Sequence, residues 1–211
     1  VLCDRPVVIA LSGIGKVAAA TTATVLIEHF GVAHIVFTGV AGGIGEGVQV
    51  GDVVVAQAYL QHDMDASPLF PRWELPGYAR ALMACDTDLS ALLLRAAHAG
   101  LTSAAQTPVR EGAVPRVHHG LVVSGDRFVS GAQESERLRD ALRAAGHDVL
   151  AVEMEGAAVA QVCADYGVPF AAVRTISDRA DDTAHVDFPH FIATVASRYA
   201  DHIVRSLLVL L

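Results

Sequence analysis

Residues 34–60 read HIVFTGVAGGIGEGVQVGDVVVAQAYL, with two apolar runs on either side of a glycine-rich segment. The runs His34–Phe37 and Asp52–Leu60 have the length and composition of strands, and the glycines between them predict a turn. Outward from this stretch, further apolar runs of strand length alternate with segments of helical length. This alternation predicts an α/β fold: a three-layer sandwich with a central mixed, mostly parallel sheet.

The other strands are expected at 6–11, 120–123, 149–152 and 168–176, and the helices at 14–30, 86–99, 132–145, 155–165 and 189–210. Residues 103–117 look like a polar connector. Residues 62–78 contain three prolines and the only tryptophan, which indicates a long ordered loop. A length of 211 residues suits one domain over 1–211.

Composition excludes several classes of protein. Apolar residues make up 53% and charged residues 18% of the chain, and no apolar run approaches the length of a membrane-spanning helix. The formal charge of −8, with no compensating basic cluster, argues against partners such as nucleic acid or anionic membranes. Three widely spaced cysteines and no signal peptide predict free thiols and a cytoplasmic location.

Polar or glycine-rich clusters follow most of the predicted strands directly. They are Ser12–Gly15, Thr38–Gly43, Ser124–Phe128, Glu153–Glu155 and Arg174–Asp178. Ligands of open α/β sheets bind beyond the carboxyl ends of the strands, so these clusters predict a single pocket. The alternative that they are only turn residues remains open for the glycines, but it explains the acidic residues poorly.

Several familiar motifs do not fit. Gly13–Ala18 matches a loose GxGxxA pattern, but the next strand ends at Phe37 without an acidic residue for a nicotinamide ribose. Lys16 is followed by Val17 and not by Ser or Thr, which excludes a Walker loop. Ser124 lacks the flanking glycines of a hydrolase nucleophile.

Two groups of potential metal ligands lack paired spacing. They are His62, Asp63 and Asp65 in the loop, and the neighbours His118 and His119. Loop-bracing or solvated roles are the simpler interpretation, and we expect neither a metal nor an organic cofactor.

Three acidic residues at strand ends are more informative. Glu153 and Glu155 flank Met154, and Asp178 ends an otherwise apolar strand. A carboxyl group at such a rim should have a raised pKa, which suits a general acid near neutral pH. The competing interpretation, that Glu153 only caps the following helix, stays open.

The motifs taken together resemble a known family. Its signature is carried by SGIGKVAAA (12–20), TGVAGGI (38–44), VGDVVV (50–55), GLVVSGDRFV (120–129), AVEMEGAAVAQVC (151–163) and VRTISDRAD (173–181). In this order and spacing they closely resemble the methylthioadenosine/S-adenosylhomocysteine nucleosidases of the purine nucleoside phosphorylase superfamily. The resemblance implies hydrolysis of the N-glycosidic bond of these adenine nucleosides, as in methionine salvage and the methyl cycle.

The resemblance also implies roles for individual residues. Asp178 would protonate purine N7, and Glu155 would bind the ribose hydroxyls. The implied substrate contacts are Ile14, Val40, Ala41, Gly42, Phe128, Val129, Glu153, Met154, Arg174, Ser177 and Phe188. In the family, part of the 62–78 loop crosses a homodimer interface, which here would offer Ala66 and Leu69. An apolar patch of Leu69, Phe70 and Trp73 independently predicts that interface.

Other functions are compatible with the resemblance, and the chain differs from the family pattern at some positions. A nucleoside phosphorylase, a futalosine hydrolase or an AMP nucleosidase would share the fold, and a catalytically silent nucleoside-binding protein is an alternative of another class. Phosphorylases place an arginine where this chain has Phe37, which favours water as the nucleophile. Val40 stands where some relatives carry a serine. The family's first strand and helix, with a glutamate that activates water, have no counterpart, so we expect a longer natural N-terminus and slow catalysis by the chain as printed.

Overall fold

The computed structural model describes residues 1–104, 114–180 and 191–211, and helices alternate with strands along them. The strands are β1 (Ile35–Gly43), β2 (Val53–Gln61), β3 (Leu82–Ala84), β4 (Val117–Ser124), β5 (Val149–Glu153) and β6 (Phe170–Asp178). The helices are α1 (Lys16–Glu28), α2 (Thr87–Ala104), α3 (Ala132–Ala144), α4 (Gly156–Tyr166), the π-helical turn η1 (Ile192–Ala196) and α6 (Ser197–Leu210).

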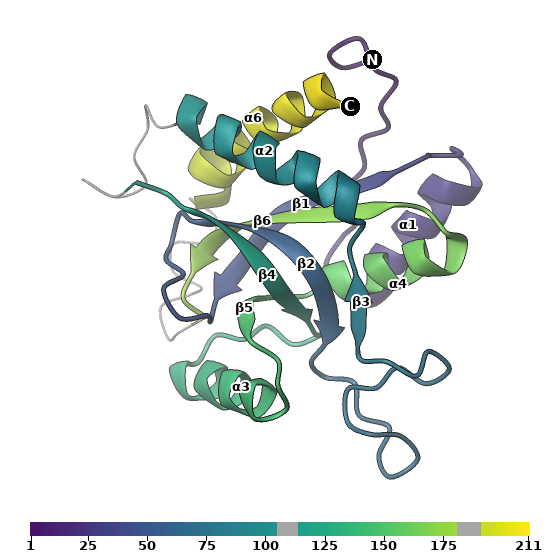
Figure 1. The fold of residues 1–211 in the computed structure, drawn as a ribbon, viewed down its shortest axis with the longest axis vertical. Helices are drawn as coiled ribbons and strands as arrows, with labels where there is room; N and C mark the ends of the chain where they lie inside the picture. Colours follow the sequence, from purple (N-terminus) through teal and green to yellow (C-terminus); the bar gives the residue numbers. More distant parts are fainter. Residues whose placement is uncertain (105–113, 181–190) are drawn as a thin grey trace.

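The six strands form one mixed sheet in the order β3-β2-β4-β5-β1-β6 (Figure 1). The pairs β1–β6, β2–β4 and β4–β5 are parallel, whereas β1–β5 and β2–β3 are antiparallel. The amino-terminal half of β2 also pairs antiparallel with β6, with Val53 opposite Thr175. The sheet therefore closes on itself, and only the short β3 extends one side of it.

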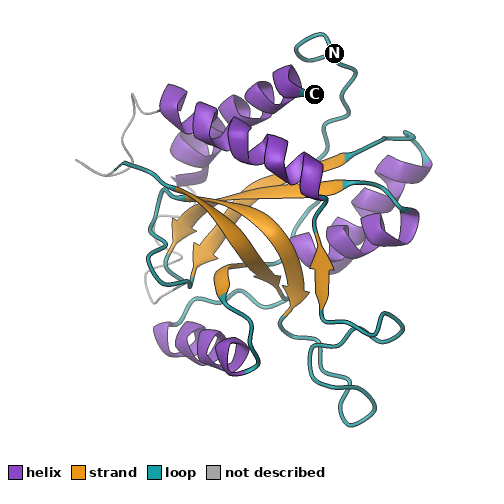
Figure 2. Cartoon of the chain, in the orientation of Figure 1, coloured by secondary structure: helices purple, strands orange, loops and turns teal. Residues whose placement is uncertain are grey.

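Helices cover the sheet in separate layers (Figure 2). Helices α2 and α6 pack together on one face, α1 and α4 lie on the other, and α3 lies beside β5 (Figure 1). The α/β prediction with a mixed sheet is thus confirmed. No helix in the described part of the chain is long and apolar enough to cross a membrane.

The apolar strands are explained by burial on both of their faces. In β2, Val53 and Val55 pack against α2 and α6, while Val54 and Ala56 face the core under α1 and α4. Successive side chains of a strand point to opposite faces, so a strand covered on both faces must be apolar throughout. Every residue of β6 is buried for the same reason.

The strand predicted at 6–11 is wrong. These residues form no strand, and Ile9 and Leu11 are 81% and 98% exposed. An apolar run becomes a strand only when it finds a strand edge to pair with. Strand β1 pairs with β5 only through Gly42 and Gly43, so the edge of its residues 35–41 away from β6 has no strand partner among the described strands, and residues 6–11 do not occupy that edge.

The loop between β2 and β3 is ordered, as predicted, but its tryptophan does not join an exposed patch. Trp73 is buried in its own chain, and its indole Nε1 donates a hydrogen bond to the carbonyl oxygen of His62 at 3.0 Å. Leu69 is 83% exposed, whereas Phe70 is only partly exposed. The predicted patch of three residues is therefore corrected to one centred on Leu69.

Candidate functional site

Strand β1 is longer than predicted, because the glycine-rich residues Thr38–Gly43 continue the strand and form no turn. Their lack of side chains makes room for neighbours. A Cβ atom on Gly39 would come within 2.6 Å of Arg174 Nη1, and one on Gly42 within 3.0 Å of Asp178 Oδ1. A glycine inside a strand marks such a close approach, which is the signal that the turn interpretation missed.

Gly42 lies between the two acidic clusters. Its register partner on one side is Asp178 of β6, and on the other side it is Val152 of β5. The segment Glu153–Glu155 follows Val152 directly, so both predicted acidic clusters flank the same glycine strand. This placement follows from sheet order and register alone.

Asp178 is buried and both of its carboxyl oxygens are held. The Ser177 hydroxyl donates to Oδ2 at 2.7 Å, and the backbone N–H of Ala180 donates to Oδ1 at 2.7 Å. A hydroxyl group can also accept a hydrogen bond, so the Ser177 contact can persist when Asp178 carries a proton. The arrangement fixes the carboxyl group in both protonation states.

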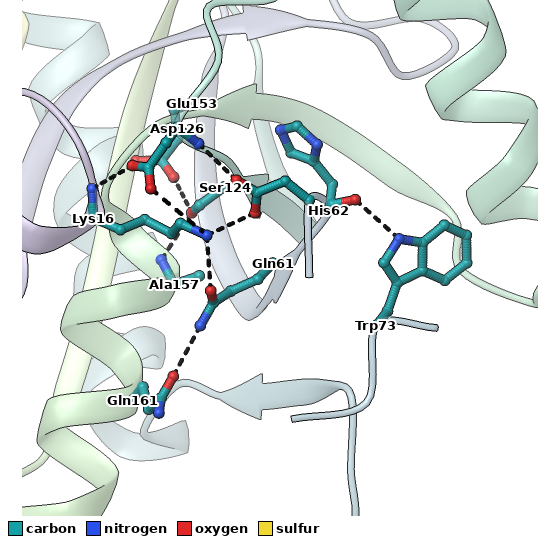
Figure 3. A network of polar contacts seen from close by, with 10 residues as sticks. Lys16, Gln61, His62, Trp73, Ser124, Asp126, Glu153, Ala157 and Gln161 are labelled. Carbon is teal, nitrogen blue, oxygen red and sulfur yellow. Dashed lines mark hydrogen bonds and ion pairs between the residues drawn. The ribbon is translucent and has the colours of Figure 1, made fainter. Parts of the chain in front are cut away.

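Glu153 and Arg174 form a buried ion pair behind the acidic residues. Arg174 Nη2 lies 2.5 Å from Glu153 Oε2, and the Ser124 hydroxyl donates to Glu153 Oε1. The same carboxylate accepts the backbone N–H groups of Glu155 and Gly156 at the start of α4. Both side chains are almost completely buried. The carboxylate of Glu153 thus binds groups of the protein itself, including Ser124 (Figure 3), and its bonds to the first backbone N–H groups of α4 agree with the helix-capping interpretation.

Glu155 is more open than Glu153. Its Oε1 accepts the backbone N–H of Gly15 at 2.8 Å. Burial raises the pKa of Glu155, and the hydrogen bond from Gly15 opposes this shift. Gly15 has φ of +93°, a conformation that favours glycine, and this turn aims its N–H at the carboxylate.

The segment after β4 joins the same site from another side. The carboxylate of Asp126 accepts the backbone N–H of Lys16 at 2.8 Å. Phe128, farther along, is 44% exposed, while Val129 is buried. Gly125 lies against His62, and a Cβ atom there would overlap the imidazole ring. Contacts therefore connect all five of the predicted clusters.

The other predicted site residues are placed as follows. Ile14 is 82% exposed next to Gly15, and Ala41 is buried within β1 beside Val40. Met154 is partly buried between the two glutamates, and Ala66 and Leu69 lie in the 62–78 loop. Phe188 lies outside the described residues.

His118 and the loop aspartates have partners within the protein, whereas the buried Nε2 of His62 has no hydrogen-bond partner among the described residues. His118 Nε2 lies 2.7 Å from Asp52 Oδ2, and Lys16 Nζ lies 2.7 Å from Asp63 Oδ1. Asp65 accepts the backbone N–H of Ser67 at 3.0 Å. Burial lowers the pKa of His62, which favours a neutral ring. These contacts agree with the loop-bracing interpretation.

Known proteins resemble this chain over most of its length. A sequence model of the phosphorylase superfamily matches residues 2–209. The structure is similar to that of 5'-methylthioadenosine/S-adenosylhomocysteine nucleosidase from Neisseria meningitidis in complex with methylthio-immucillin-A. The identity is 37% and the TM-score 0.81, over 96% of this chain and 80% of that one.

Two other solved structures are similar to a comparable degree. A futalosine hydrolase mutant of Helicobacter pylori shares 32% identity with a TM-score of 0.79, over 96% of this chain and 80% of that one. The S-adenosylhomocysteine nucleosidase of Streptococcus pyogenes, in complex with 5-methylthiotubericidin, shares 34% identity with a TM-score of 0.77, over 93% and 76%.

Proposed function

Because this chain belongs to the phosphorylase superfamily, and within it to the nucleosidases, we propose that it hydrolyses the N-glycosidic bond of 5'-methylthioadenosine and S-adenosylhomocysteine. The products are adenine and a 5-thioribose. The observation that carries the proposal is the placement of two carboxyl groups, Asp178 and Glu155, on either side of the glycine strand β1.

Asp178 acts as the general acid in this proposal. Cleavage of the bond leaves negative charge on the departing purine, and a proton delivered to N7 lets adenine leave as a neutral molecule. General acid catalysis contributes roughly 10²–10⁴-fold. The two donors on its carboxyl oxygens hold Asp178 in one orientation, which such a transfer requires.

Glu155 stabilises the sugar. The ribose develops positive charge in an oxocarbenium-like transition state, and a nearby carboxylate lowers the energy of that charge. Gly15 N–H fixes Oε1 of Glu155, and in this proposal the carboxylate binds the ribose hydroxyls. The buried carboxylate of Glu153 serves a positioning role, since it binds the backbone N–H of Glu155.

The segment after β4 binds the base. The exposed ring of Phe128 stacks on adenine, and the backbone of the buried Val129 binds its edge. Leu69 and Ala66 are proposed to reach the pocket of a second copy in a homodimer, which suits the 83% exposure of Leu69. This mechanism needs neither a metal nor an organic cofactor.

Water is favoured over phosphate as the nucleophile. A phosphorylase needs cations to hold phosphate, and this chain has Phe37 where phosphorylases place an arginine. The guanidinium of Arg174 lies 4.1 Å from the centre of the Phe37 ring, and Glu153 neutralises its charge. Arg174 is therefore a poor phosphate ligand.

The test is release of adenine from 5'-methylthioadenosine and from S-adenosylhomocysteine, each measured with and without phosphate. We expect equal rates in both buffers and a free 5-thioribose as the product. A phosphorylated sugar formed only with phosphate would establish a phosphorylase instead. Faster turnover of futalosine would assign the chain to that hydrolase. Binding of adenine without turnover would favour the catalytically silent alternative.

A further inference from the structure

Lys16 is unusual in the composition of this chain and in its low exposure. It is the only lysine among 15 basic residues, all the others being arginine. Its side chain is only 16% exposed, although it starts a helix at the surface. A lysine ammonium is a compact charge with three donors, whereas arginine presents a planar fork, so the two are not interchangeable at a crowded site.

The ammonium group of Lys16 joins side chains from two strand ends. Nζ lies 2.7 Å from Asp63 Oδ1, 3.0 Å from Gln61 Oε1 and 3.9 Å from Asp126 Oδ2 (Figure 3). Gln61 ends β2, and Asp126 follows the end of β4. Gln61 continues the connection, because its Nε2 donates to Gln161 of α4 at 2.8 Å.

Asp63 connects the ammonium group of Lys16 to the segment after β4 through two hydrogen bonds. While one of its oxygens accepts from Lys16, the other accepts the backbone N–H of Asp126 at 2.9 Å. Burial alone would raise the pKa of Asp63, but the hydrogen bonds from Lys16 and Asp126 outweigh it and lower the pKa. Asp63 is therefore held as a carboxylate between two donors that tie α1 to the segment after β4.

The backbone at the start of α1 reaches two parts of the same site. The N–H of Lys16 binds Asp126, and the N–H of Gly15 binds Glu155. The ammonium end of Lys16 reaches Asp126 through Asp63 and directly, at 3.9 Å from Asp126 Oδ2, and it also contacts Gln61. Within the described part of the chain it forms no hydrogen bond or ion pair with Glu155. Loss of the lysine side chain should thus loosen the Asp126 side and leave the Gly15–Glu155 contact in place.

We propose that Lys16 is a positioning residue that fixes the segment Gly125–Val129 for binding of the purine base. It acts through Asp63, which connects the ammonium group to the backbone of Asp126. The inference rests on the proposed function, because it assigns that segment to the base. It goes further in naming a lysine that contacts no substrate as a determinant of base affinity.

The test is the dissociation constant for free adenine, measured by calorimetry on the full chain and on Lys16→Met. If the loosened segment is competent for about a tenth of the time, the apparent dissociation constant rises about tenfold. The Michaelis constant should rise in parallel while kcat changes less than about threefold, since Asp178 and Glu155 are not disturbed. A purely structural role would lower thermal stability without this split.

Asp63→Ala provides a second way to cut the same connection, and it keeps the test valid if Lys16→Met does not fold. It should weaken adenine binding to a similar extent, and the double variant should be no worse than either single variant. Arg205→Met is the matched control, because it removes an exposed cation paired with Asp201 at 2.8 Å on α6. It should leave adenine affinity unchanged.

Two results would overturn the inference while leaving the proposed function intact. One is unchanged adenine affinity in Lys16→Met, and the other is additive losses in the double variant. If the unaltered chain neither binds adenine nor releases it from nucleosides, the proposed function itself fails. The two failures are therefore separated by the behaviour of the unaltered chain.

Discussion

Gly42 and Asp178 lie side by side in the sheet, as register partners of β1 and β6. A Cβ atom on Gly42 would approach Asp178 Oδ1 to 3.0 Å and the Ala180 Cβ to 2.9 Å. Because Gly42 has no side chain, the carboxyl group of Asp178 has room to adopt its orientation. Catalysis by a positioned acid tolerates little displacement of that group.

Gly42→Ala is expected to lower kcat by at least about tenfold by displacing Asp178. The matched control is Gly43→Ala, where the new methyl group would crowd Ile176 and Val48 at 3.0 and 3.1 Å. Both substitutions add a methyl group to strand β1, but only the one at Gly42 crowds the carboxyl group of Asp178. Equal kcat values for the two variants, at similar melting temperatures, would contradict this account.

Asp178→Asn should reduce kcat by at least about 10²-fold, because the amide cannot deliver a proton to the purine. The fold should survive, since asparagine can accept the hydrogen bond from Ala180 N–H. Single-turnover kinetics together with circular dichroism would check both statements. Near-normal turnover of this variant would remove Asp178 from the role of acid.

Glu155→Gln should abolish most activity and yet raise the melting temperature at neutral pH. Burial raises the pKa of Glu155 above its ordinary value of 4.5, so the folded state favours the neutral acid. Ionised Glu155 therefore costs stability once the pH passes its folded pKa. This cost, and the advantage of the glutamine, should vanish as the pH falls below the ordinary value.

The same shift predicts the acid limb of the pH profile. If the ionised form of Glu155 stabilises the sugar, kcat/KM should fall with decreasing pH from a point above 4.5. Glu136→Gln, an exposed change on α3, serves as the control for both measurements and should alter neither. An unchanged melting temperature in Glu155→Gln at neutral pH would argue against the raised pKa.

Arg174→Met should destabilise the protein by about 3–5 kcal/mol, because it leaves the buried carboxylate of Glu153 without its partner. Urea unfolding would measure the change. Arg205→Met breaks an exposed ion pair and should cost less than about 1 kcal/mol. Similar losses for the two variants would mean that Glu153 is compensated by its other hydrogen bonds.

The order of strands and helices could largely be predicted from apolar runs, because β2 and β6 are buried on both faces and carry an unmistakable pattern. The three-residue β3 was missed, since so short a strand has no periodicity of its own. The run at 6–11 forms no strand, because apolarity alone does not ensure that a run pairs with a strand edge.

The candidate site could be predicted in part for a related reason. Asp178 and Glu155 lie at or just beyond strand ends, and the order of strands in the sheet brings these two ends to either side of β1. The role of Thr38–Gly43 as a continuing strand depends on side chains from β6, which local turn preferences cannot show. The sequence pattern around Lys16 bears only on a phosphate-binding loop, although its being the single lysine is a signal available in the sequence.

Closure of the sheet has a consequence for how the chain folds as it is synthesised. Among the described strands, β1 pairs only with β5 and β6, and the closing contact joins Val53 to Thr175. Strand β1, which precedes the other described strands, must therefore wait for partners from the last third of the chain. Such distant pairings slow folding and leave apolar strands exposed to aggregation meanwhile. We expect the nascent chain to depend on chaperones until β6 has emerged.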